Sequence, residues 1–295
     1  MAGGLFESYA SAIADLPGGA LTAADLMTDA FLLRRDGDLS IYYVPFERLN
    51  PRARVVLIGI TPGFTQMRIA YEVARDGLAG GFGHEEILGR VDRTASFAGA
   101  MRANLNRMLD DLGLPALLGI DATDQLFAER SELMHSTSAL RNPVFVAGSN
   151  YTGSAPPIAT TPLLRSEILR TLGPELASVA SAILIPLGRA AEEALLILIA
   201  DGIVAPGRCC MGFPHPSGAN GHRARLFAQQ RDHLAHTLAA WFDSTRPIAP
   251  VKQQDLPVDD LLSRLATAVS AALTADERDV LAERLREIAE RLASR

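Results

Sequence analysis

Three short apolar runs constrain the fold of this chain most strongly. Arg54–Ile60 reads RVVLIGI, Ala182–Leu187 reads AILIPL, and Cys209–Phe213 is shorter but also largely apolar. Runs of this kind without polar alternation are typical of strands that are buried on both faces, as in parallel sheets. Glu132–Leu140 is a weaker candidate for a fourth strand. The sequence therefore predicts a sheet of four buried strands.

Segments with helical spacing lie between these strands and imply crossover connections. We expect helices at 5–15, 23–33, 102–112, 166–172, 189–200 and 222–242, and a short strand-like run at 39–45. Alternating strands and helices form right-handed crossovers that place helices on both faces of the sheet. The predicted fold class is α/β: a three-layer α/β/α sandwich with a central, mainly parallel four-stranded sheet, plus a C-terminal helical hairpin.

The chain divides into four segments on this interpretation. Residues 1–50 form an N-terminal helical and strand extension packed on the core, and residues 51–242 form the α/β domain. Residues 243–257 contain three prolines and are expected to be a linker. Residues 258–295 carry two amphipathic patterns, which predict a helical hairpin that packs on the core or on a second copy of the chain.

Composition excludes several classes of protein. The net charge of −6 argues against a strongly basic nucleic-acid binder, although the acid-free segments 133–166 and 205–231 each carry arginines and offer a local anion-binding face unless this reflects compositional drift. Lys252 is the only lysine, so Schiff-base chemistry is not expected. The two cysteines, Cys209 and Cys210, cannot build a disulfide framework, a four-cysteine zinc site or a cysteine-held cluster. We expect a cytoplasmic protein without a membrane span.

Two proline-containing motifs follow the first and the last of these strands. Gly59-Ile60-Thr61-Pro62-Gly63 closes the first, and His215-Pro216-Ser217-Gly218-Ala219-Asn220 closes the last. The carboxyl ends of parallel strands share one edge of the sheet, and ligands bind at that edge in such folds. We therefore expect the two motifs to meet there.

These motifs resemble those of the uracil-DNA glycosylase superfamily, over roughly residues 50–242. Its members carry a Pro-containing motif after the first core strand and a His-Pro-Ser motif after the last. A strand ending in Leu187-Gly188 before an Ala-rich helix is also similar to theirs. The resemblance implies an enzyme that flips a base out of DNA and hydrolyses its N-glycosidic bond. With Lys252 as the only lysine, a monofunctional enzyme without β-elimination is expected.

The resemblance assigns catalytic roles to His215 and Thr61. Breaking the glycosidic bond produces an anionic base and an oxocarbenium-like sugar, so a hydrogen-bond donor and a positioned water are needed. His215 is expected to donate to the base oxygen; the alternative is a turn histidine that bonds a backbone carbonyl. Thr61 stands where the family has Asp or Asn, and its hydroxyl orients water without deprotonating it. The alternative is that Thr61 caps a helix beginning near Phe64.

The resemblance also implies a base-binding pocket. Gly63 stands where some members have a Tyr that blocks the thymine methyl, and Phe64 is a possible substitute wall. Phe82 resembles the aromatic residue that stacks on the base, or it anchors its loop in the core. No Asn ends the second strand, so Ser136, Ser138 and Asn150 remain alternatives for reading the base edge. The predicted base-binding set is Gly59, Ile60, Pro62, Gly63, Phe64, Phe82, Ser136, Ser138 and Asn150.

The loop after His215 is expected to enter the minor groove and press on phosphates, as it does in this family. Arg223 is the candidate phosphate ligand, unless it is an exposed residue at a helix start. The predicted DNA-binding set is Ser217, Gly218, Asn220, His222 and Arg223. No metal or cofactor is implied.

Three classes of function follow. The first is a monofunctional glycosylase that removes uracil from DNA in base excision repair. The second is a non-catalytic nucleic-acid or nucleotide-binding module of the same fold, favoured by Thr61 in place of Asp or Asn. The third is a scaffold or regulatory protein that acts through the C-terminal helices, with homo-oligomer formation through them.

Overall fold

A parallel sheet forms at the apolar runs of the sequence. In the structure, a computed structural model that describes residues 4–245, strands β3 (Val55–Gly59), β4 (Met134–Ser138) and β7 (Ile183–Pro186) lie in the order β4-β3-β7. Leu57 of the central strand faces Ser136 on one side and Ile185 on the other. All three strands run the same way, so their carboxyl ends share one edge.

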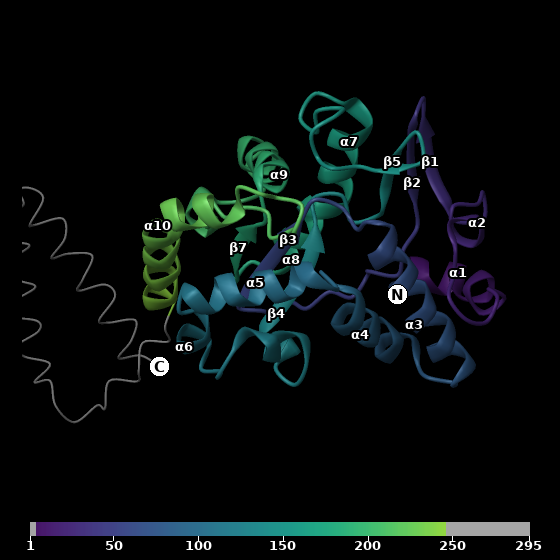
Figure 1. The fold of residues 1–295 in the computed structure, drawn as a ribbon, viewed down its shortest axis with the longest axis horizontal. Coiled ribbons are helices and arrows are strands. Elements are labelled where there is room, and N and C mark those ends of the chain that lie inside the picture. The colour runs from purple at the N-terminus through teal and green to yellow at the C-terminus, as the bar shows by residue number, and fades with distance from the viewer. Residues whose placement is uncertain (1–3, 246–295) are drawn as a thin grey trace, which may run out of the picture. The chain divides into compact units, whose positions relative to one another are not determined.

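Helices pack on both faces of this sheet (Figure 1). Alternate residues of β3 enter two separate apolar clusters: Val56 and Ile58 join one, and Val55 and Leu57 join the other. The first cluster includes residues of α7 (Pro162–Glu167), α8 (Gly173–Ser178) and α9 (Arg189–Ala200). The second includes residues of α5 (Ala100–Asp111), α6 (Leu114–Leu118) and α10 (Arg223–Ser244). The chain is thus an α/β protein with helices on either side of a parallel sheet.

The predicted fourth strand at Cys209–Phe213 is reduced to an isolated bridge. Cys209 pairs in parallel with Leu184 of β7, and the Cys210 amide donates to the Leu184 carbonyl at 2.8 Å. The segment does not continue as a ladder because Gly212 adopts φ +98° and its amide bonds the Glu192 carboxylate instead. The described sheet therefore has three strands, with this segment beside β7.

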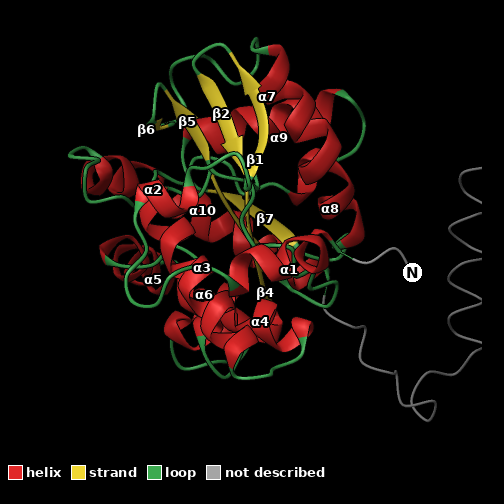
Figure 2. Cartoon of the chain, turned by 90° about the vertical axis from the view of Figure 1, so that its right-hand side faces the viewer, coloured by secondary structure: helices red, strands yellow, loops and turns green. Residues whose placement is uncertain are grey.

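A second, antiparallel sheet was not predicted from the sequence. It contains β1 (Leu32–Asp36), β2 (Leu39–Tyr42), β5 (Val144–Val146) and β6 (Ser149–Asn150), in that order (Figure 2). The helix expected at 23–33 is wrong beyond Leu26, because Leu32 pairs with Tyr42 in this sheet and the helical part, α2, is only Ala23–Leu26.

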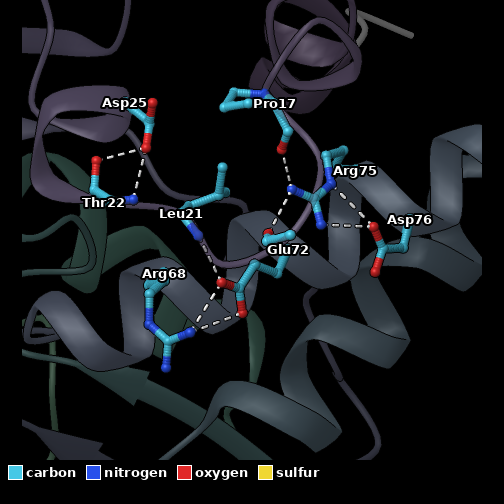
Figure 3. Close-up of polar contacts among 9 residues, drawn as sticks. Pro17, Leu21, Thr22, Asp25, Arg68, Glu72, Arg75 and Asp76 are labelled. Atoms are coloured by element: carbon cyan, nitrogen blue, oxygen red, sulfur yellow. Dashed lines mark hydrogen bonds and ion pairs between the residues drawn. The ribbon is translucent and has the colours of Figure 1, made fainter.

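The N-terminal segment is tied to helix α3 (Phe64–Ala79) by polar contacts (Figure 3). Arg75 donates to the carbonyls of Pro17 and Gly19, and Glu72 accepts from the Leu21 amide at 2.9 Å. Apolar residues of 6–44 also share a core with α3 and α4 (His84–Ala95). This packing fixes α3, which begins just after β3, at the carboxyl edge of the parallel sheet.

The segment expected as a linker from 243 begins inside a helix, because α10 ends at Ser244. The rest of that linker, from 246, and the hairpin expected at 258–295 lie outside the described residues. Within residues 4–245, no helix combines the length and the apolar character that a membrane crossing requires. The other elements are α1 (Leu5–Ala14), 3₁₀ helices at Thr123–Phe127, Ser131–Leu133 and Pro206–Arg208, and a π-helical turn at Ile168–Leu172.

Candidate functional site

Two connected spaces lie at the carboxyl edge of the parallel sheet. The first, called here the inner pocket, has a volume of about 60 Å³ and is lined by hydroxyl side chains, the rings of Phe46 and Phe97, Arg141 and His215. The second, the outer groove, has about 770 Å³ and includes the starts of α3 and α9 and part of the loop after His215. Both spaces share five lining residues: Ile60, Thr61, Gln66, Met101 and His215. The two sequence motifs therefore meet at the junction of a small pocket and a wide groove.

His215 lines both spaces, and only one of its two ring nitrogens has a partner among the described residues. Its Nδ1 accepts a hydrogen bond from the Ser217 amide at 3.4 Å, so the proton of a neutral ring resides on Nε2. No residue among those described bonds Nε2. Burial lowers the pKa of His215 from its ordinary value, which favours the neutral ring. The structure thus offers a neutral N–H donor rather than an imidazolium, and the alternative of a histidine bonded to a backbone carbonyl does not hold.

Glycine at position 188 lets His215 approach the end of β7. Gly188 has φ +93° and ψ 169°, a conformation reserved almost entirely for glycine, and a Cβ there would lie 2.8 Å from the His215 Cβ. Its amide donates to the Phe213 carbonyl at 2.8 Å. The Leu-Gly strand ending noted in the sequence therefore positions His215.

The loop after His215 is held by side chains that bond its own backbone. Asn220 Nδ2 donates to the His215 carbonyl at 3.1 Å, and Asn104 Nδ2 donates to the Pro216 carbonyl at 3.0 Å. Arg223 Nη1 donates to the Ser217 carbonyl at 2.6 Å. The backbone of the loop is therefore fixed, while the His215 ring remains available.

Among the predicted DNA-binding residues, Asn220 and Arg223 thus serve the loop itself. Asn220 Oδ1 also accepts from the His222 amide, and the Ser217 hydroxyl accepts from the Ala219 amide. Gly218 is exposed, with open space where a side chain would be. Ser217 and Asn220 line the outer groove, whereas Gly218, His222 and Arg223 do not.

The Thr61 hydroxyl is committed to the backbone of a neighbouring segment. It donates to the Asn142 carbonyl at 3.0 Å and accepts from the Val144 amide at 3.2 Å. Only one lone pair remains for another contact. Thr61 lines both spaces, but its hydroxyl first of all ties the end of β3 to the start of β5. The alternative role as a helix cap is wrong, because the N-cap of α3 is Gly63.

Four predicted residues around Thr61 have clear positions. Gly59, Ile60 and Pro62 line the inner pocket, and Gly63 lines the outer groove. A Cβ on Gly59 would lie 3.1 Å from the Phe97 ring and 3.2 Å from the Ser138 hydroxyl, so this glycine leaves room for both.

The predictions for Phe64 and Phe82 are wrong. Phe64 packs against the N-terminal core and lines neither space. Phe82 follows the C-terminal end of α3, a helix of 16 residues that is therefore about 24 Å long. The Arg90 guanidinium stacks on its ring, with Cζ at 3.7 Å from the ring centroid. Phe97 is the aromatic side chain that lines the inner pocket together with Phe46. Its φ of +53° is uncommon for a non-glycine residue, but no sequence signal marked it.

The candidates for reading a base edge separate into two groups. Ser136 and Ser138 line the inner pocket, and the Ser136 hydroxyl bonds that of Ser96 at 2.8 Å. Thr137 also lines it, and its hydroxyl is buried without a partner among the described residues. Asn150 instead lies in the outer groove, where its Oδ1 accepts from the Phe64 amide at the start of α3. The amide of Asn150 therefore caps a helix.

A buried ion cluster behind the inner pocket was missed in the sequence. Glu175 bonds His135 Nε2 through Oε1 at 2.7 Å, and its Oε2 accepts from Arg141 at 2.6 Å and 3.1 Å. Burial alone would raise the pKa of Glu175, but the bonds from His135 and Arg141 hold this pKa below its ordinary value. Glu175 is therefore a carboxylate that fixes Arg141. The partners are 34 residues apart, and no local pattern links them.

Few charged side chains line the two spaces. Among the described residues, Arg141 is the charged residue of the inner pocket, with His215 neutral, and Arg189 and Glu193 are those of the outer groove. Among residues 4–245, no group of three or more His, Cys, Asp or Glu side chains is placed to hold a metal ion.

Comparison with known proteins gives one informative relative. YoxB of Bacillus subtilis (strain 168), described as an uncharacterized protein, is 40% identical to this chain over 237 residues, which cover 80% of the chain and 92% of YoxB. No family model matches the chain, and no solved structure matches it. At this identity and coverage, the chain belongs to the same protein family as YoxB.

Proposed function

We propose that this protein is a monofunctional glycosylase that excises uracil from DNA in the cytoplasm. The observation that carries the proposal is that His215 lines both the inner pocket and the outer groove, while its Nε2 has no hydrogen-bond partner among residues 4–245. A flipped base would occupy the pocket, and the strand from which it comes would follow the groove. The resemblance of both motifs to the uracil-DNA glycosylase superfamily supports the same assignment. The proposal includes residues 209–213 as a fourth strand of the parallel sheet, and the parallel bridge from Cys209 to Leu184 supports this.

The chemistry follows from the leaving group. As the glycosidic bond breaks, negative charge develops on the base, and a donor from His215 Nε2 to a base oxygen stabilises it. A neutral imidazole suits this role because its Nε2–H donates a hydrogen bond without placing a positive charge on a buried ring. Water then adds to the oxocarbenium-like sugar. Within the part of the chain that the structure describes, Glu193 is the only carboxylate that lines either space, and it is paired with Arg189 at 2.9 Å. The proposed reaction therefore depends more on stabilising the departing nucleobase than on a side chain that takes a proton from the attacking water.

A second candidate function is a module that binds a nucleobase without cutting. The bonds from the Thr61 hydroxyl to Asn142 and Val144 favour it, because they leave this side chain little capacity to orient a water. On this proposal the inner pocket and outer groove would bind the same ligand, and no base would be released.

Base release separates the two candidates. The full chain is incubated with single- and double-stranded oligonucleotides that contain one labelled deoxyuridine, followed by alkali, beside His215→Ala. A glycosylase gives strand cleavage only after alkali, reduced about 10²- to 10³-fold in the variant. Release that is absent from both substrates with excess protein would refute the glycosylase, and uracil-dependent DNA binding without release would establish the binding module.

A further inference from the structure

A third cavity, called here the arginine pocket, lies away from the carboxyl edge of the parallel sheet. It has a volume of about 550 Å³, and its lining includes Arg34 of β1, Arg141 and Arg170. Within residues 4–245, its lining has only Arg141 in common with the inner pocket and no residue in common with the outer groove. A cavity of this volume is the size of a site for a small molecule.

One face of a helical segment supplies much of this lining. The residues that it contributes lie one, three or four positions apart, as residues on one side of a helix do. They are Arg170, Thr171, Pro174, Glu175 and Ser178. Arg170 and Thr171 belong to the π-helical turn between α7 and α8. Such turns are rare and are frequently found at functional sites.

Two arginines of the lining are held by one buried carboxylate. Arg170 Nη2 donates to Glu167 Oε2 at 2.5 Å, and Arg34 Nε lies 3.3 Å from Glu167 Oε1. The Glu167 side chain is only 5% exposed, whereas those of Arg34 and Arg170 are 47% and 51% exposed. The carboxylate is therefore shielded from solvent, and the two arginine side chains that it brings together remain accessible.

Both arginines keep donors that are not used. Among the described residues, the two terminal nitrogens of Arg34 and the Nε and Nη1 of Arg170 have no hydrogen-bond partner. One carboxylate balances only one of the two positive charges, so the group of Arg34, Arg170 and Glu167 has a net charge of +1. Guanidinium groups that are fixed and still carry free N–H groups are preorganised to bind an oxyanion.

The carboxylates that line the pocket have partners of their own. Glu175 accepts hydrogen bonds from Arg141 and is bonded to His135, as described above. Glu47 accepts a hydrogen bond from the Tyr43 hydroxyl at 2.5 Å. Neither is within bonding distance of Arg34 or Arg170 in the structure, so these two arginines keep their free donors.

The arginine pocket also has an apolar side. Six large apolar side chains are exposed within residues 4–245, and two of them, Leu5 and Leu49, line this pocket. Leu33 and Pro174 line it as well. Apolar side chains that gather at a cavity and remain exposed mark a surface for a ligand.

We propose that the arginine pocket binds a small phosphate monoester, with the phosphate on Arg34 and Arg170 and the organic group on Leu5 and Leu49. A phosphate monoester carries up to two negative charges and three terminal oxygens, so it accepts hydrogen bonds from both guanidinium groups at once. The site is separate from the proposed excision of uracil and exists whether or not that reaction occurs.

Titration calorimetry on the full chain tests this site. The probes are phenyl phosphate, inorganic phosphate and an unphosphorylated single-stranded oligonucleotide, all at one ionic strength. The variants are Arg34→Gln, Arg170→Gln, Leu49→Ser and the control Arg165→Gln. Arg165 is half-exposed and also pairs with a carboxylate, Asp201 at 3.4 Å, but it lines none of the three spaces. The melting temperature of each protein is measured alongside.

We expect the wild type to bind phenyl phosphate several-fold more tightly than inorganic phosphate, because the ring buries apolar surface on the leucines. Arg34→Gln and Arg170→Gln should each weaken binding of phenyl phosphate about tenfold or more, since each removes hydrogen bonds between charged groups. Leu49→Ser should reduce the preference for phenyl phosphate and leave the affinity for inorganic phosphate unchanged. Arg165→Gln should bind as the wild type does. If an arginine variant does not fold, the wild-type preference and Leu49→Ser decide.

Three results would overturn the proposal. They are a wild type that does not bind phenyl phosphate, an affinity that is unchanged in folded Arg34→Gln and Arg170→Gln, and displacement of phenyl phosphate by the oligonucleotide at a lower concentration, which would indicate a nucleic-acid site. Uracil release is measured on the same proteins. Phenyl phosphate binding without uracil release would refute the glycosylase alone, and uracil release without phenyl phosphate binding would refute the phosphate site alone.

Discussion

The turn at Thr61 and the loop at His215 lie at the same edge of one sheet, yet they use their polar side chains in opposite ways. At Thr61 the side chain bonds the backbone of another segment, so the hydroxyl is occupied. At His215 other side chains bond the backbone of the loop, and one imidazole nitrogen keeps no partner among the described residues. The first arrangement braces the site, and the second leaves a hydrogen-bond donor unpaired in residues 4–245.

The difference shows what a motif can and cannot indicate. Both segments look alike in the sequence: a strand, a proline and a small residue. Only the hydrogen-bond partners, which lie 81 and 83 residues away for Thr61, separate a structural from a chemical role. The variants below test whether that separation is real.

Gly188→Ala should have the largest effect. The new Cβ would meet the His215 Cβ at 2.8 Å, and the backbone would be held in a region that alanine avoids at a cost of about 1–3 kcal/mol. We expect a clearly lower melting temperature and loss of most base release, measured by thermal denaturation and the oligonucleotide assay. Gly218→Ala, in open space on the loop after His215, is the control. Equal behaviour of the two variants would show that Gly188 does not position His215.

Thr61→Val should lower stability with a smaller effect on chemistry. It removes the hydroxyl that bonds Asn142 and Val144, leaving a carbonyl and an amide unpaired at about 1–3 kcal/mol in total. Urea denaturation measures this loss. Thr61→Ser keeps the hydroxyl and should retain most of the stability. If Thr61→Val unfolds at the same urea concentration as the wild type, the brace is not an important contact.

Asn220→Ala should have a milder effect, because it removes one bond to the His215 carbonyl and one from the His222 amide at a partly buried site. We expect a loss of about 1 kcal/mol in unfolding free energy and weaker binding of oligonucleotide, measured by anisotropy. Asn220→Asp keeps the acceptor oxygen but not the donor, so its stability and binding should lie between those of the wild type and Asn220→Ala. Indifference of both properties would contradict the role of Asn220 in holding the loop.

The pH dependence of stability should show the smallest effect. The folded-state pKa of His215 lies below the ordinary value of 6.5, so only the unfolded chain takes up this proton as the pH first falls below 6.5. The wild type should therefore lose stability from pH 6.5 downwards towards the folded-state pKa, and His215→Gln should lose less over that range. Denaturation curves across this range measure it, with exposed His233→Gln as the control. If His215→Gln lost more stability than the wild type as the pH falls, the contribution of His215 to the pH dependence would have the opposite sign, which would contradict this account.

The sequence predicted β3 and β7 because uninterrupted apolar runs need no tertiary information to be recognised, whereas β4, with the sequence MHSTS, was only a weaker candidate. It did not predict β5 and β6, which have three and two residues and are too short for a periodic pattern. The segment 209–213 has the composition of a strand, but Gly212 diverts its amide to Glu192.

The site was predicted only in part, for a similar reason. Thr61 follows β3, Ser138 ends β4 and His215 follows the segment beside β7, so their meeting follows from the parallel topology. Phe97 and Arg141 reach the pocket through chain paths that no local spacing encodes. Phe82 was predicted from its resemblance to the stacking aromatic residue of the family, but helix α3 carries its loop away from the site.

The central claim is that His215, and not Thr61, acts on the substrate. The direct measurement is single-turnover release of uracil from a deoxyuridine oligonucleotide by the wild type, His215→Asn and Thr61→Val, at a temperature where all three are folded. The account predicts that His215→Asn slows release about 10²- to 10³-fold, whereas Thr61→Val stays within about tenfold of the wild type. Release by His215→Asn at the wild-type rate, or an equal loss in a folded Thr61→Val, would contradict it.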